Sequence, residues 1–225
     1  MTDSLCHPAL PTLSPAGVPT SPGEPLLRPR IRPAQLADIP PLTELLASSF
    51  YDCTGWKYWV YPVIKFGIQA DLRQRLYSEK TDYACLTALV IPPPAAPSQP
   101  SAHQQVAGTV EVSQRQAWPW QGIRSNYAYI SNLAVAPPFR RQGIAAQLLA
   151  ACEALAITWE MEDLLLHVME DNLAACKLYR RAGFNLFQAE ATPLTGLGLQ
   201  PRRLLMHKRL GRPTSNFSSP AGEPS

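Results

Sequence analysis

The sequence predicts a mixed α/β domain, and three features of the chain carry this prediction. Apolar and polar residues alternate in short runs such as VAGTVEVS at residues 106–113, which is typical of β-strands. Longer segments such as residues 60–77 place apolar residues on one helical face. The largely apolar run DLLLHVM at residues 163–169 follows a helix-forming segment, which favours a buried strand reached by a crossover helix and parallel to its neighbour.

The two ends of the chain differ in composition from its middle. Residues 1–28 and 211–225 are rich in Pro, Ser and Gly, and the chain has 24 prolines in all. Such segments cannot bury enough apolar surface to offset the entropy of ordering, so we expect disordered tails. The remaining residues, 29–210, are enough for one domain with a sizeable core.

Within this domain, turn-forming residues separate the strands and helices. We expect strands at residues 30–33, 83–91, 106–113, 129–135, 163–169, 184–189 and 204–210. We expect helices at residues 35–50, 60–77, 141–158 and 172–182. Asn172 suits the N-cap of the last helix and Gly183 its C′ position. The aromatic residues at 50–61 are expected to pack on the core or to line an acceptor pocket.

Composition and charge argue against several classes of protein. A net charge of +3 with no dense basic stripe argues against a nucleic-acid partner, and no apolar run is long enough to cross a membrane. The N-terminal region lacks the apolar core of a secretory signal and is poorer in Arg and Ser than a transit peptide. The five cysteines are odd in number and lack metal-like spacing, so we expect reduced thiols, no metal and a cytoplasmic protein. Cys152 and Cys176 are expected in the core.

The central stretch is YISNLAVAPPFRRQGIAAQLLA at residues 129–150, which is a strand, a turn and the start of a helix. The R-x-x-G-x-A string begins at Arg140, and Gly143 and Ala145 leave little bulk at the first helical turn. Unpaired N–H groups and the positive end of the helix dipole can bind an anion there. The alternative is a tight turn with solvated arginines, and the complete string favours the anion site.

A second motif follows about thirty residues later and has the form N-x-x-A-x-x-L-Y-x-x-x-G-F. Its residues are Asn172, Ala175, Leu178, Tyr179, Gly183 and Phe184. Together the two motifs resemble the GNAT superfamily of N-acetyltransferases, including its plastid and cyanobacterial branch and the N-terminal protein acetyltransferases. The resemblance implies a central, mostly antiparallel sheet with one splayed parallel pair, flanked by about four helices.

The resemblance also implies acetyl-CoA as cosubstrate. Backbone N–H groups of one run would bind its diphosphate, and these residues are Arg140, Arg141, Gln142, Gly143, Ile144, Ala145 and Ala146. The pantetheine arm would pair like an extra strand with Leu133, Ala134 and Val135. Asn172 and Tyr179 would complete the cofactor site.

The chemistry of acetyl transfer requires one group that gives a proton and one that takes a proton. Tyr179 matches the family tyrosine that protonates the departing thiolate, since a phenol is protonated at neutral pH. His167 matches a base that deprotonates the acceptor amine, and Tyr129 matches a tyrosine that holds a water with such a histidine. Glu111 is the reserve base. The alternative for each aromatic side chain and for His167 is simple packing in the core.

The sequence therefore predicts an N-acetyltransferase acting on a protein amine, either an N-terminal α-amino group or a lysine. A small arylalkylamine acceptor is the alternative, and a CoA-binding module without catalysis is a third. The loop at residues 188–202 lacks the tyrosines that peptide acetyltransferases often carry there, which leaves lysine and small amines open. We expect a monomer or a homodimer.

Overall fold

The computed structural model describes residues 29–50, 61–78, 81–91, 104–117, 126–190 and 200–211. The proline-rich loop at 92–101, most of the aromatic segment at 50–61 and the loop containing Trp118 and Trp120 lie outside the described residues, apart from their ends. Of the predicted tails, only residue 211 is described, so their disorder stays a prediction.

One seven-stranded sheet organises the described part of the chain, and its strands lie in the order β1-β2-β3-β4-β5-β7-β6. The strands are β1 (Arg30–Pro33), β2 (Tyr83–Val90), β3 (Gln105–Arg115), β4 (Tyr127–Val135), β5 (Asp163–Met169), β6 (Asn185–Glu190) and β7 (Arg203–Arg209). Neighbouring strands are antiparallel except β4 and β5, which are parallel. The predicted sheet with one parallel pair is confirmed.

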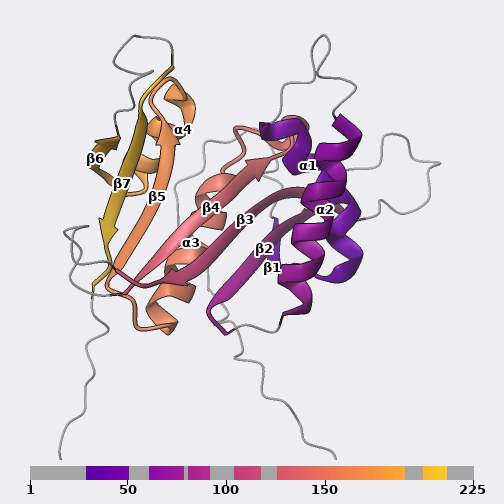
Figure 1. Ribbon diagram of the computed structural model, residues 1–225, viewed down its shortest axis with the longest axis horizontal. Helices are drawn as coiled ribbons and strands as arrows, with labels where there is room; N and C mark the ends of the chain where they lie inside the picture. Colours follow the sequence, from indigo (N-terminus) through magenta and orange to yellow (C-terminus); the bar gives the residue numbers. More distant parts are fainter. Residues whose placement is uncertain are drawn as a thin grey trace, which may run out of the picture.

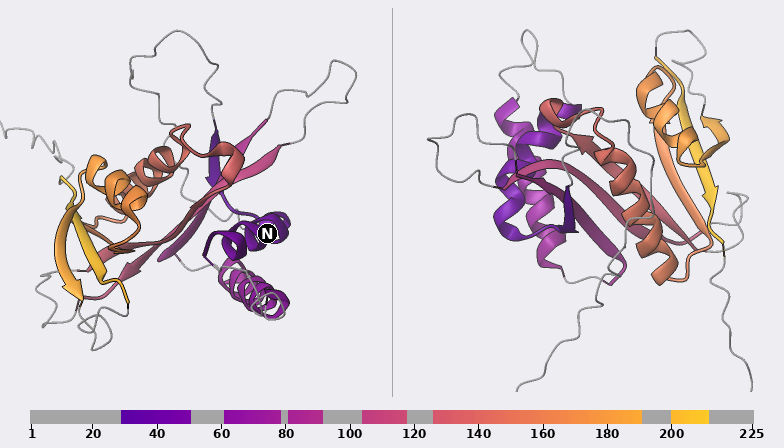
Figure 2. Two further views of the ribbon diagram at one scale, coloured as in Figure 1. Left: turned by 90° about the horizontal axis from the view of Figure 1, so that it is seen from above. Right: turned by 180° about the vertical axis from the view of Figure 1, so that it is seen from behind.

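Four α-helices of the described residues flank this sheet: α1 (Ile39–Phe50), α2 (Tyr61–Tyr77), α3 (Ile144–Thr158) and α4 (Leu173–Arg181). Figure 2 shows α1 and α2 on one face of the sheet and α3 and α4 on the other. Short 3₁₀ turns, η1 (Leu36–Asp38) and η4 (Pro137–Phe139), precede α1 and α3. All four predicted helices are therefore present in the fold.

Several predicted boundaries are wrong by one to four residues, among them the start of α1, which lies at Ile39 and not at residue 35. Two of the other differences have a visible structural reason. Helix α3 begins at Ile144 and not at Arg141, because Arg141 and Gly143 have positive φ angles of 65° and 80°, which a right-handed helix cannot contain. Strand β3 continues to Arg115, where a loop was expected, because Arg115 pairs with Tyr127 of β4. In both places the strand or turn geometry depends on a neighbouring segment.

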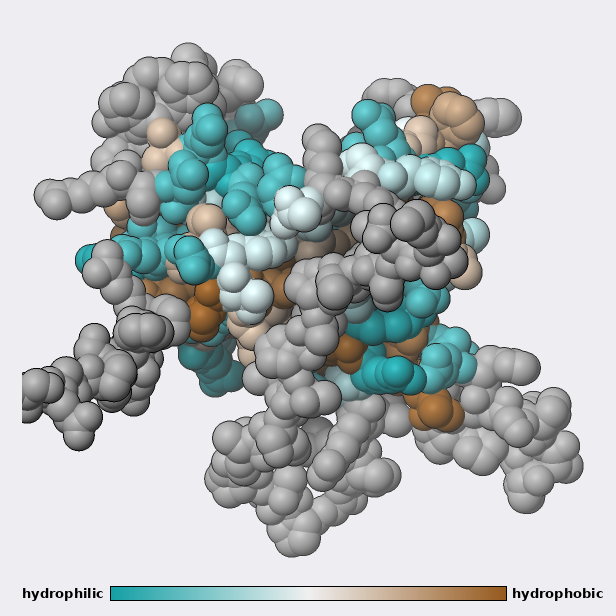
Figure 3. All heavy atoms as spheres, turned by 90° about the horizontal axis from the view of Figure 1, so that it is seen from below, coloured by the Kyte–Doolittle hydropathy of each residue, from teal (hydrophilic) through white to brown (hydrophobic). Residues whose placement is uncertain are grey.

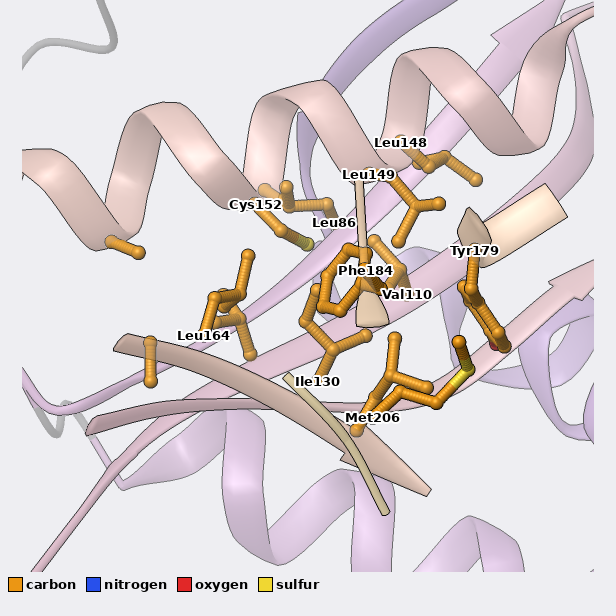
Figure 4. Packing of buried hydrophobic residues seen from close by; sticks show 14 of the residues in the cluster. Leu86, Val110, Ile130, Leu148, Leu149, Cys152, Leu164, Tyr179, Phe184 and Met206 are labelled. Carbon is orange, nitrogen blue, oxygen red and sulfur yellow. The ribbon is translucent and has the colours of Figure 1, made fainter. Parts of the chain in front are cut away.

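The sheet separates two clusters of buried apolar side chains. The larger cluster lies under α3 and α4, and Figure 4 shows Phe184 among Leu149, Val110 and Ile130. Cys152 and Cys176 belong to it, so their expected place in the core is confirmed. The smaller cluster joins α1 and α2 to the other face through Leu42, Leu45, Leu46 and Leu72. Since both faces of the sheet are covered, its central strands are buried on both sides.

Strands β4 and β5 diverge soon after they pair. Their parallel pairing spans only three residues, Ala128–Ile130 against Leu164–Leu166, and Figure 1 shows the two arrows spreading apart towards their ends. The β3–β4 register shifts between Thr109 and Glu111, and Asn132 of β4 has a φ of 53°. This bulge bends β4 away from β5. The backbone of β4 beyond it is therefore available to another partner.

The face drawn in Figure 3 shows mostly hydrophilic residues where the described part of the chain is visible. On the face drawn in Figure 3, hydrophilic residues separate the hydrophobic ones into small patches. Among the described helices, none combines the length and the hydropathy that crossing a membrane requires.

Candidate active site

The edge of β4 that faces β5 has no partner strand beyond the short parallel pairing within the described residues. The residue after the strand, Ala136, donates its N–H to a β3 carbonyl at 2.8 Å. Because successive residues of a strand direct their N–H and C=O groups to opposite sides, Leu133 and Val135 direct theirs towards β5, and Ala134 directs its own towards β3. Arg140 Nε donates to the Val135 carbonyl at 2.9 Å, which agrees with this orientation. Leu133 and Val135 thus direct their backbone groups to the edge of β4 that lacks a partner strand among the described residues.

A buried carboxylate holds the bulge in β4. Glu111 is 1% exposed, and its Oε1 accepts a hydrogen bond from Asn132 Nδ2 at 3.0 Å. Its Oε2 accepts from the Arg75 guanidinium of α2 at 2.7 Å. The side-chain amide thereby stabilises the left-handed backbone of Asn132. With both oxygens bonded and almost no exposure, Glu111 supports the strand and is not open to an acceptor amine.

The turn between η4 and α3 presents a set of backbone N–H groups. Left-handed Arg141 and Gly143 alternate with Gln142, and such alternation turns successive N–H groups inward as an anion-binding nest. Gly143 is the N-cap of α3 and offers no side chain to the N–H groups of the first helical turn. A Cβ at Gly143 would meet no atom within 4 Å, so there is space in front of this helix end. The predicted run from Arg140 to Ala146 therefore fits a diphosphate.

Asn172 was predicted both to cap a helix and to contact the cofactor. Its Oδ1 accepts from the Ala175 N–H at 3.1 Å and caps the N-terminus of α4, as the sequence predicts. Its Nδ2 group, which donates hydrogen bonds, is not used by this cap. The cap sets where α4 begins and so where Tyr179 lies.

Tyr179 projects from α4 into the larger core cluster. It is 8% exposed and packs edge-to-face on Phe184, with ring centroids 6.0 Å apart. Burial raises the pKa of Tyr179 to about 12, and the electrostatic influence of Cys176, Tyr129 and Cys152 adds to the shift. The phenol therefore stays protonated over the whole neutral range.

Three side chains form a continuous hydrogen-bonded chain on the face opposite to Tyr179. The Tyr129 hydroxyl lies 2.8 Å from His167 Nδ1, and His167 Nε2 lies 2.9 Å from Glu190 Oε1. Tyr129 and His167 come from the two diverging strands, because Tyr129 pairs with Leu165, two residues before His167. The structure thus brings together the predicted base and its predicted tyrosine and adds Glu190, which sequence reasoning missed.

The surroundings of His167 favour the neutral form of its imidazole. Burial lowers its pKa, and the Glu190 carboxylate offsets this in part, while the charges of Arg203 and Arg115 lower it further. The Arg115 guanidinium lies 4.1 Å from the centre of the Tyr129 ring. A carboxylate only accepts hydrogen bonds, so Nε2 of the neutral ring carries the hydrogen. Nδ1 is then a bare acceptor that receives the Tyr129 O–H.

Comparison with known proteins agrees with this geometry. A family model described as Acetyltransferase (GNAT) family matches residues 70–184, half of the chain. The chain belongs to the GNAT family of acetyltransferases. The match ends at Phe184, so it includes Tyr129, His167 and Tyr179 but not Glu190.

Two chloroplastic GNAT proteins of Arabidopsis thaliana are similar in sequence. GCN5-related N-acetyltransferase 10 is 34% identical over 134 residues, which cover 56% of this chain and 49% of the relative. GCN5-related N-acetyltransferase 4 is 46% identical over 66 residues, which cover 29% of this chain and 23% of the relative. The chain thus spans about half the length, or less, of these curated relatives.

Solved GNAT structures share the fold. The PaiA N-acetyltransferase of Thermoplasma acidophilum in complex with coenzyme A has a TM-score of 0.57 at 16% identity, covering 82% of this chain and 100% of that one. NAA60 of Arabidopsis thaliana in complex with a bisubstrate analogue has a TM-score of 0.57 at 18% identity, with the same coverage. The predicted GNAT fold is therefore confirmed.

Proposed function

We propose that this chain is an acetyl-CoA-dependent N-acetyltransferase whose acceptor is a protein amine. The observation that carries the proposal is the hydrogen bond of 2.8 Å between Tyr129 and His167, at the place where β4 and β5 diverge. A neutral imidazole bonded to a hydroxyl is a base within reach of an acceptor. The fully protonated Tyr179 on the other side of the sheet supplies an acid.

Acetyl-CoA supplies an activated acetyl thioester, and the chain's own residues would hold it. The nest and helix end at Arg141–Ala146 would bind the diphosphate through N–H groups. The N–H and C=O groups of Leu133 and Val135 would pair with the amides of the pantetheine arm. An N–H on this edge of β4 also suits an oxygen that gains negative charge during acyl transfer.

The proton path follows from the tautomer of His167. As the acceptor amine attacks, the Tyr129 oxygen, directly or through a water, takes its proton, and the Tyr129 O–H passes its own proton to Nδ1 of His167. The imidazolium that forms is stabilised by the Glu190 carboxylate, 2.9 Å from Nε2. Tyr179 holds the proton that the departing thiolate takes.

Solved structures of the same fold favour a protein amine over a small amine as the acceptor. Proteins of like fold include a ribosomal-protein-alanine N-acetyltransferase of Brucella melitensis and the NatC complex bound to Gag peptide and CoA. The fold therefore accommodates peptide acceptors. The chloroplastic relatives make a location in a plastid an alternative to the predicted cytoplasm. The described cysteines are free thiols, which is compatible with either reducing compartment.

The test is acetyl-CoA turnover with a panel of acceptors, followed by thiol release and by mass spectrometry of the products. The panel contains peptides with a free N-terminus, N-terminally blocked peptides with one lysine, and an arylalkylamine. We expect acetylated peptide. Acetylation of the arylalkylamine alone would refute the protein acceptor, and no turnover with any amine would refute the activity.

His167→Ala should lower kcat/KM by about 10²–10⁴-fold, the usual value of a general base. The loss should be largest at low pH and should shrink as the acceptor deprotonates unaided. The matched control is His207→Ala, because His207 lies on the neighbouring strand β7 and also pairs with a carboxylate, Asp163, at 2.7 Å. Equal losses in the two variants would indicate a folding defect, and a wild-type pH profile in His167→Ala would remove His167 from the mechanism.

A further inference from the structure

Glu190 ends strand β6, two strands away from the histidine that it contacts. Strands β5, β7 and β6 lie side by side at one end of the sheet (Figure 1), and Glu190 pairs with Arg203 of β7. Its Oε1 reaches His167 Nε2 on β5 at 2.9 Å, while its Oε2 lies 3.7 Å from an Arg203 nitrogen. The carboxylate thus has one oxygen on His167 and the other near the Arg203 guanidinium.

We propose that Glu190 is a positioning residue that fixes His167 as its Nε2–H tautomer, so that Nδ1 receives the proton of Tyr129. This inference rests on the proposed function, in which His167 is the base. A histidine without a partner at Nε2 can carry its hydrogen on either nitrogen. With the hydrogen on Nδ1, the ring would donate to Tyr129 and could not accept its proton. A carboxylate at Nε2 excludes that arrangement, because it only accepts hydrogen bonds.

The charged groups around His167 determine how strongly Glu190 acts. Tyr129 of β4 faces Nδ1, Glu190 of β6 faces Nε2, and Arg203 of β7 and Arg115 of β3 oppose a positive charge on the ring. Among these groups, Glu190 is the one that can oppose this effect with a negative charge on the side of Nε2. Removing its charge should therefore make His167 a weaker base. The Glu190 side chain is 39% exposed, so water screens part of its charge and the effect should be moderate.

Two substitutions separate charge from geometry. Glu190→Gln keeps an oxygen that can accept from Nε2–H but removes the negative charge. Glu190→Ala removes the acceptor and leaves both tautomers available. We expect a loss of about 10-fold in kcat/KM for Glu190→Gln, below the usual range for the base itself, and a larger loss for Glu190→Ala. In Glu190→Gln the acid limb of the pH profile should also move to lower pH. The KM for acetyl-CoA should stay unchanged.

The closing experiment observes the His167 ring directly, so it does not depend on turnover. ¹⁵N-edited NMR of the full chain should show the Nε2–H tautomer in the wild type, a lower ring pKa in Glu190→Gln and mixed tautomers in Glu190→Ala, with the signal assigned by its loss in His167→Ala. The matched control is Asp163→Asn, which removes the carboxylate from His207 and should shift only the His207 signal. A His167 tautomer and pKa that are the same in all Glu190 variants overturn the inference. If they shift but the wild type acetylates no amine, the inference about the tautomer stands and the proposed function fails.

Discussion

The link between Arg75, Glu111 and Asn132 gives a prediction whose size follows from burial. The Glu111 side chain is 2% exposed and the Arg75 side chain is 41% exposed, so the two ends of this ion pair are unequal. Removing Arg75 leaves a buried negative charge with Asn132 as its remaining side-chain partner among the described residues. Removing the charge of Glu111 leaves a half-exposed guanidinium that water and Asp71, at 2.9 Å, can still stabilise. The two substitutions should therefore differ in cost.

We expect Arg75→Met to destabilise the protein by about 3 kcal/mol, the lower end of the cost of breaking a buried ion pair. Glu111→Gln should cost about 1 kcal/mol, because a neutral amide can still bond one of the two partners. The double variant should be more stable than Arg75→Met alone, since no buried charge is left unpaired. Urea unfolding at neutral pH, compared through midpoints at a constant m value, measures all three.

The control for this series is Asp71→Asn, which breaks an exposed i,i+4 pair of the same arginine and should cost at most about 0.5 kcal/mol. Equal costs for Arg75→Met and Glu111→Gln would refute the reasoning from unequal burial. A double variant as unstable as the sum of the single ones would refute the charge coupling. Because the same contacts hold the bulge of β4, Arg75→Met should also raise the KM for acetyl-CoA; an unchanged KM would separate the bulge from cofactor binding.

Three further predictions concern single side chains. Tyr179→Phe should lower kcat by about 10²–10⁴-fold with unchanged acetyl-CoA affinity, because only the transition state uses the hydroxyl; an unchanged kcat would exclude it as the acid. Gly143→Trp should abolish acetyl-CoA binding measured by calorimetry, because the new side chain would fill the open space before α3. The left-handed backbone at this position also disfavours any residue with a Cβ. Wild-type affinity in this variant would refute the diphosphate site. Phe184→Ala should cost about 3–5 kcal/mol in urea unfolding, because Phe184 is 1% exposed within the larger core cluster, and a loss below about 1 kcal/mol would contradict its central packing.

The local pattern of the sequence was sufficient for most of the elements. The predicted bounds of β1 and β5, residues 30–33 and 163–169, are the observed ones, and α2 differs by one residue. Helical periodicity and strand alternation involve neighbours along the chain, so they can be read without knowing the fold. The two motifs likewise placed the N–H groups of α3, the Asn172 cap and Tyr179 on the correct elements, because each motif lies within one short continuous segment of the chain.

Contacts between distant strands could not be read in this way. His167 and Glu190 are 23 residues apart, and Arg75 and Glu111 are 36 residues apart. Whether they meet depends on the register of β6 against β7 and on how α2 packs on the sheet. A shift of one residue in a strand's register would turn every side chain of that strand to the other face. The sequence alone therefore predicted most of the elements and the candidate site residues, while the tertiary structure decided that Glu190 contacts His167 and that Glu111 contacts Asn132 at the bulge.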